Sequence, residues 1–72
     1  MSDLMKIRLS AMLDTEIEQV KGMISNETLW AHGSETEEQA QMHTENIENL
    51  EEYKQLLIEM QEQVNQEGKI NV

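Results

Sequence analysis

The feature that most constrains the fold is the helical spacing of apolar side chains in two long segments. Within residues 2–25 and again within residues 34–67, apolar side chains recur every three or four positions. That spacing places them on one face of an α-helix and does not fit the alternation of a strand. We therefore predict two helices, each with one apolar stripe. The stripe comprises Leu9, Leu13, Ile17, Val20 and Ile24, then Ile47, Leu50, Tyr53, Leu57, Met60 and Val64.

Local signals set the bounds of the first predicted helix. Ser2 is a good N-cap, because its hydroxyl can accept a hydrogen bond from a free backbone N–H of the first turn. We expect a helix over residues 2–25, followed by a corner with a short helical turn over residues 26–33. Trp30 lies in that corner. It is either a hydrophobic plug that closes the end of the fold or, if it is exposed, a candidate anchor for a partner.

The second predicted helix begins with a capping signal. Ser34 stands three residues before Glu37, which matches the S-x-x-E capping box. Gly68 is a typical residue at which a helix ends. We therefore predict a helix over residues 34–67 and a frayed tail over residues 68–72.

Two such helices predict an all-α antiparallel helical hairpin, which we expect to form a homodimer. The chain has 72 residues and no cysteine, and chains this short rarely bury a sufficient core without disulfides, metal or self-association. The predicted helices would be about 36 Å and 50 Å long, so the second would overhang the first and leave residues 56–64 uncovered. A dimeric four-helix bundle would cover them.

The predicted second helix is strongly acidic on one side. Lys54 is its only base, and six of its glutamates fall in a sector about 100° wide, opposite the apolar stripe. Solvated helix faces usually interleave both signs of charge, whereas here like charges repeat at helical spacing. The side is either an ordinary solvated face or a partner-binding surface, which we call the acidic ridge. The acidic ridge comprises Glu37, Glu45, Glu48, Glu52, Glu59 and Glu62.

Catalytic, cofactor and metal sites are not expected. The chain offers no cysteine nucleophile and no glycine-rich phosphate loop. Neither His32 nor His43 follows a glutamate by three residues, as the di-iron helical bundles require. His43 lies near the apolar stripe, where it is either a boundary side chain or a pH sensor.

The charge balance narrows the expected function. A formal net charge of −10 opposes direct binding to nucleic acid or to an anionic membrane and permits a basic protein partner. No stretch resembles a membrane span or a signal peptide, so we expect a cytoplasmic protein. In size, charge and helical content the chain resembles the small acidic inhibitors of phages and mobile elements, some of which mimic DNA.

Two functions follow from these patterns. We favour a non-enzymatic protein that binds and blocks a basic surface of a protein partner through the acidic ridge. The alternative is a homo-oligomeric coiled-coil adaptor or structural protein that engages a partner helix through its apolar stripe.

Overall fold

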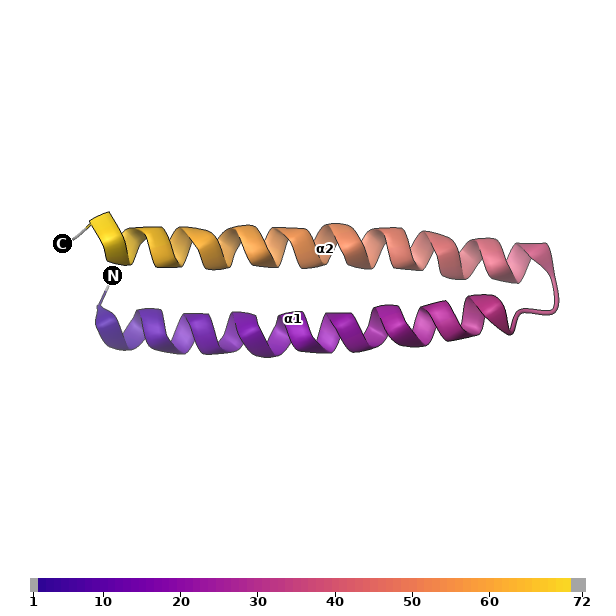
Figure 1. Cartoon of the computed structure of the whole chain (residues 1–72), viewed down its shortest axis with the longest axis horizontal. Helices are drawn as coiled ribbons and strands as arrows, with labels where there is room; N and C mark the ends of the chain where they lie inside the picture. The colour runs from indigo at the N-terminus through magenta and orange to yellow at the C-terminus, as the bar shows by residue number, and fades with distance from the viewer. Residues whose placement is uncertain (1, 71–72) are drawn as a thin grey trace.

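The chain folds as an antiparallel pair of helices. The computed structural model describes the backbone of residues 2–70 and the side chains of residues 2–65. Helix α1 (Asp3–His32) and helix α2 (Glu37–Ile70) lie side by side and are joined by a loop over residues 33–36, so that both ends of the chain lie at the same end of the rod (Figure 1). The principal dimensions are 55 × 15 × 11 Å. The prediction of an all-α helical hairpin is confirmed.

The start of α1 follows the prediction. Ser2 has an extended backbone, and its Oγ accepts a hydrogen bond from the Met5 N–H at 3.2 Å. This contact satisfies one of the four N–H groups that a helix start leaves without an intrahelical partner.

The predicted corner over residues 26–33 is wrong, because α1 continues through this stretch to His32. Nothing between Ser25 and His32 breaks a helix, since the first glycine after that point is Gly33. Glu27 and Ala31 also continue the apolar stripe at helical spacing, and both are partly buried. The helix ends where the Gly33 N–H donates to the Leu29 carbonyl at 3.0 Å.

The predicted capping box at Ser34 and Glu37 is also wrong. The Ser34 hydroxyl donates to the Trp30 carbonyl at 2.7 Å, so it caps the end of α1 and not the start of α2. Thr36 is the residue that caps α2, because its Oγ1 accepts from the Gln39 N–H at 3.2 Å. Gln39 in turn accepts from the Glu35 N–H at 3.2 Å. The start signal is therefore T-x-x-Q, two residues after the predicted one.

Helix α2 also runs past its predicted end at residue 67. Gly68 lies inside it, and no described glycine has a positive φ, the conformation that ends many helices. A glycine inside a helix costs about 1 kcal/mol relative to alanine, which need not end a helix. The predicted tail therefore begins as helix, and residues 71–72 lie outside the described part of the chain.

The longer α1 removes the predicted overhang. The helices have 30 and 34 residues, so the whole of α2 up to its last turns has α1 beside it. Leu57 and Val64, which we expected to lack cover within the chain, are buried. Tyr53 and Met60 belong to the predicted stripe but are 42% and 47% exposed. The buried core consists of Leu13, Ile17, Val20, Leu57 and Val64, flanked by the partly buried Leu9, Ile24, Leu50 and Ile58.

Replacement of Leu57 by alanine tests the core. Leu57 is 6% exposed and Leu29, on the far side of α1, is 68% exposed. We expect Leu57→Ala to lower the free energy of unfolding by about 2–5 kcal/mol, because it leaves a cavity in the core. Leu29→Ala should change it by less than about 0.5 kcal/mol. Urea unfolding followed by circular dichroism measures both, and equal losses would contradict this core.

Replacement of Thr36 by alanine tests the cap of α2. We expect Thr36→Ala to lower the free energy of unfolding by about 1 kcal/mol, because the Gln39 N–H loses its acceptor. Thr44→Ala is the matched control, since the Thr44 hydroxyl only bonds the Ala40 carbonyl of its own helix. It should be neutral or slightly stabilising, because alanine is the better helix former. A Thr36 variant as stable as the Thr44 variant would contradict the cap.

Candidate functional site

The six glutamates of the acidic ridge are all exposed on α2. Three ion pairs join side chains in the described part of the chain, and none involves a ridge glutamate. They are Lys21 with Glu18, Lys54 with Glu51, and His43 with Glu27 if the imidazole is protonated. Lys54, the only base of α2 with a described side chain, therefore faces a glutamate outside the ridge. The structure brings the six predicted residues to one surface, and their role in binding stays a prediction.

The acidic ridge is a band of one sign of charge along α2. From Glu37 to Glu62 it extends about 38 Å along the helix. Neighbouring members three or four positions apart have side chains about 5–6 Å from each other. That separation is shorter than the screening length of about 8 Å at physiological ionic strength. The potentials therefore add within two groups, Glu45 with Glu48 and Glu52, and Glu59 with Glu62. The two groups are about 10 Å apart along the helix, and Glu37 is about 12 Å from the first.

Trp30 does not close the end of the hairpin. Its side chain is 56% exposed, so the prediction of a buried plug is wrong. The ring lies 5.9 Å from the His43 ring, centroid to centroid, at an interplanar angle of 48°. The other interpretation, that Trp30 is an anchor for a partner, stays a prediction.

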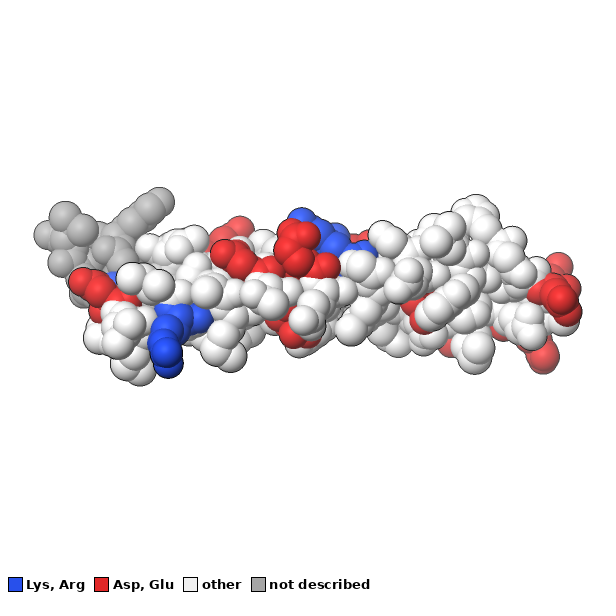
Figure 2. Space-filling model, turned by 90° about the horizontal axis from the view of Figure 1, so that it is seen from below, with Lys and Arg blue, Asp and Glu red and all other residues white. Residues whose placement is uncertain are grey.

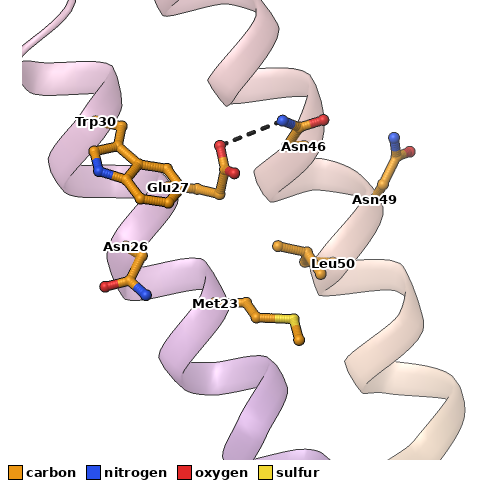
Figure 3. Close-up of a pocket in the computed structure, with 7 residues that line it drawn as sticks. All are labelled: Met23, Asn26, Glu27, Trp30, Asn46, Asn49 and Leu50. Carbon is orange, nitrogen blue, oxygen red and sulfur yellow. Dashed lines mark hydrogen bonds between the residues drawn. The ribbon is translucent and has the colours of Figure 1, made fainter.

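An open groove lies beside Trp30, between the two helices (Figure 3). Its volume is about 350 Å³. Met23 and Leu50 point toward one another across it, one from each helix (Figure 3). The groove is lined by Met23, Asn26, Glu27, Trp30, Asn46, Asn49 and Leu50.

A polar cluster centred on Glu27 lies at one edge of this groove. Its Oε2 is 2.6 Å from His43 Nδ1 and accepts a hydrogen bond from Asn46 Nδ2 at 3.3 Å. The side chains of Glu27 and His43 are only 15% and 20% exposed. The cluster joins α1 to α2 near the loop and so helps to fix their register. We did not predict it, although the spacing from Val20 through Ile24 to Glu27 is the signal that could have shown it.

The described side chains offer no group of three or more His, Asp or Glu that could hold a metal ion. The pair of Glu27 and His43 has no serine, threonine or tyrosine hydroxyl among its described hydrogen-bond partners. No described helix is long and apolar enough to cross a bilayer.

The structure also shows a second, apolar surface, which we did not predict from the sequence. Eight of the eleven exposed large apolar side chains fall on one side of the hairpin, and we call this side the methionine-rich face. On α1 they lie within about 20° of one another around the helix axis and on α2 within about 60°. Tyr53 Oη donates to Glu16 Oε1 at 3.2 Å, which shows that these flanks of the two helices adjoin. The face comprises Met5, Met12, Met23 and Trp30 of α1, with Met42, Tyr53, Leu56 and Met60 of α2.

The outer side of α1 carries few charged groups near the loop (Figure 2). The half of the rod nearest the loop is predominantly uncharged, and acidic groups gather at its tip (Figure 2). Exposed methionines and a tryptophan favour contact with another apolar surface, because thioether side chains adapt to irregular partners.

No protein-family model, curated protein or solved structure matches this chain. The function is therefore inferred from the fold and the two surfaces.

The Tyr53 hydroxyl provides a test of the contact between the helices on the methionine-rich face. Partial burial against α1, together with the charge and the hydrogen bond of Glu16, raises the pKa of Tyr53 above its ordinary value of 10.0. The fold thus favours the neutral phenol, and this stabilisation is complete below pH 10 and lost as the pH rises through the raised pKa. Absorbance titration of the only tyrosine measures the shift. Glu16→Gln should lower the pKa toward 10, whereas Glu18→Gln, which removes a charge without contacting Tyr53, should not. Equal effects of the two variants would contradict the contact.

Proposed function

We propose that the protein is a cytoplasmic, non-enzymatic binding protein whose acidic ridge binds and blocks a basic surface of a protein partner. The single observation that carries the proposal is the arrangement of the ridge. Its six glutamates are exposed on one side of α2, and none has a cationic partner among the described side chains. Like charges at helical spacing cost stability, so a use outside the chain accounts for them better than folding does.

The ridge is suited to a basic groove that normally holds a nucleic acid. Within Glu45, Glu48 and Glu52, and between Glu59 and Glu62, the carboxylates are spaced at intervals comparable to those of phosphates along a strand. The helix holds all six on one side. Because α2 is already ordered along α1, little backbone freedom would be lost on binding, which favours affinity. Long-range attraction between the ridge and a basic partner would also speed their association. We therefore propose that the ridge acts as a nucleic-acid mimic.

We also propose that two hairpins form a four-helix bundle. The support is the small core, which in the described part of the chain holds five buried side chains. A two-helix hairpin of this size buries too little apolar surface for much stability by itself. A second hairpin would enlarge the core by covering exposed apolar surface.

A second candidate function is supported by the methionine-rich face. The apolar stripe that we expected to engage a partner helix is largely used between α1 and α2, since Leu13, Ile17, Val20, Leu57 and Val64 are buried there. The methionine-rich face is a different surface and stays exposed. An adaptor that binds a partner helix would use this face, and its binding would depend little on salt.

The ridge proposal is tested by removing charge from two different places. The ridge variant carries Gln at 45, 48, 52 and 59, and the control carries Asn at 14 and Gln at 18, 35 and 51. Each of the two variants loses four negative charges. Each protein is immobilised, exposed to a cell lysate at low and at high salt, and its captured proteins are compared by mass spectrometry.

We expect a basic protein that is captured by the wild type and by the control variant and released by salt. The ridge variant should bind that protein about tenfold more weakly or worse, because tenfold corresponds to only about 1.4 kcal/mol and four charged contacts are lost. Capture of the same protein by the ridge variant at unchanged affinity would contradict the blocking function. Salt-insensitive capture would favour the adaptor.

A further inference from the structure

The methionine-rich face has the size of a protein interface. The broad side of the rod measures 55 × 15 Å, an outline of about 800 Å², which is similar in magnitude to the accessible surface that one partner buries in an interface of standard size. The apolar side chains on it are between 42% and 69% exposed and extend from Met5 near the open end to Trp30 and Met42 near the loop. The face is therefore large enough for a stable contact along the whole hairpin.

The face is also nearly free of unsatisfied charge. Between the two helices it carries two carboxylates, Glu16 and Glu27, which are hydrogen-bonded within the hairpin to Tyr53 and to His43 with Asn46. A third, Glu38, lies at its outer edge, at the helical angle of Leu56. The opposite side carries Asp14, which accepts a hydrogen bond from Gln61, and the ion pair of Lys54 with Glu51. A chain of net charge −10 repels its own copies, so a face whose exposed side chains are mostly apolar is where two copies can meet.

The two edges of the face differ in charge. At about 100° per residue, the α2 edge carries Glu38, Glu45, Glu52 and Glu59, and the α1 edge carries Arg8, Gln19 and Asn26. A two-fold axis parallel to the rod would lay the α1 edge of each copy over the acidic α2 edge of the other. A two-fold axis across the rod would instead lay α2 on α2 and set glutamates against glutamates. The first arrangement sets one cation and two neutral side chains against the acidic edge and avoids the repulsion between glutamates that the second creates.

From these observations we propose that the methionine-rich face docks a second copy of this chain, with α1 of each hairpin over α2 of the other. This proposal rests on the dimer that we proposed together with the function, and it adds the contact face and the orientation of the two copies. Every helix is then antiparallel to its neighbours, as in an up-and-down four-helix bundle. The groove beside Trp30, between Met23 and Leu50, is covered in this dimer.

The mass of the protein in solution tests the contact face. Sedimentation equilibrium should give twice the chain mass of 8.4 kDa for the wild type. Leu56→Glu and Met12→Glu each place a charge twice in the symmetric interface and should weaken the dimer by about 100-fold or more. Leu29→Glu makes the same change as Leu56→Glu on the far side of α1, where the side chain is 68% exposed, and should leave the dimer intact. Circular dichroism shows whether each variant keeps its helices.

Three results would overturn the proposal. One is a wild type that stays at the monomer mass at the highest accessible concentration, in which case a partner's helix is the remaining occupant of the face. Another is a dimer that survives both Leu56→Glu and Met12→Glu. The third is a dimer that is lost in Leu29→Glu while that variant stays helical.

Disulfide crosslinking tests the orientation, because the chain has no cysteine of its own. Glu16 contacts Tyr53 and Glu27 contacts His43, so Gln19 and Glu52 lie at nearly the same level along the rod. When Gln19→Cys and Glu52→Cys proteins are mixed and oxidised, the mixed disulfide should exceed both homodimeric products. A predominant Gln19→Cys homodimer would overturn the proposed orientation.

The dimer and the blocking function fail separately. The masses of the ridge variant and its control are measured in the same runs, so a change in capture can be compared with a change in assembly. A monomeric wild type that still captures a basic protein through the ridge would overturn the docking of a second copy only. A dimeric wild type with salt-insensitive capture would overturn the blocking function only.

Discussion

Apolar contact along one seam holds α1 to α2, and the other features of the molecule depend on it. Five buried side chains form this seam in the described part of the chain, with Val20 fully buried at its centre. Polar contacts between the helices, such as Glu27 with His43, fix the register at particular levels. A core this narrow covers only one side of each helix, so most of the surface of both helices remains available for other molecules.

The acidic ridge and the methionine-rich face occupy different sides of α2. The acidic ridge lies opposite the seam, while Tyr53, Leu56 and Met60 lie beside it on the methionine-rich face. In the proposed dimer, Glu45, Glu52 and Glu59 lie along the edge shared with the second copy, whereas Glu37, Glu48 and Glu62 point away from it and stay open to a basic partner. Self-association and binding to a partner are thus compatible in one molecule.

Helical periodicity predicted the two helices and most of the core, because the period of apolar side chains depends on burial along the whole helix. It could not predict where α1 ends and α2 begins. Ser34 and Thr36 are both good capping residues, and the choice depends on whether the Ser34 hydroxyl bonds the preceding Trp30 carbonyl. Glu27 was not predicted for a related reason. A carboxylate at a stripe position looks like a break in the apolar pattern, and its hydrogen-bond partners His43 and Asn46 lie on the other helix. The error in the length of α1 then produced the false overhang of α2.

The exposure of Trp30 shows a limit of composition as a guide. A large aromatic side chain near a chain reversal is expected to be buried, but its position on α1 places it on the flank of the seam, beside the His43 ring and 56% exposed. The six ridge glutamates, by contrast, were placed correctly on the exposed side of α2, because their positions follow from the helix period alone.

The short loop over residues 33–36 also determines the order in which the hairpin can close. Residues near the loop are close in sequence, as Glu27 and His43 are, whereas Asp14 and Gln61, which meet toward the open end, are far apart. Contacts near the loop therefore enclose the least chain and cost the least closure entropy. Once they form, each further turn of α2 joins α1 at a small added cost. We expect pairing to spread from the loop and fraying to begin at the open end, so the two ends of the rod differ in local stability.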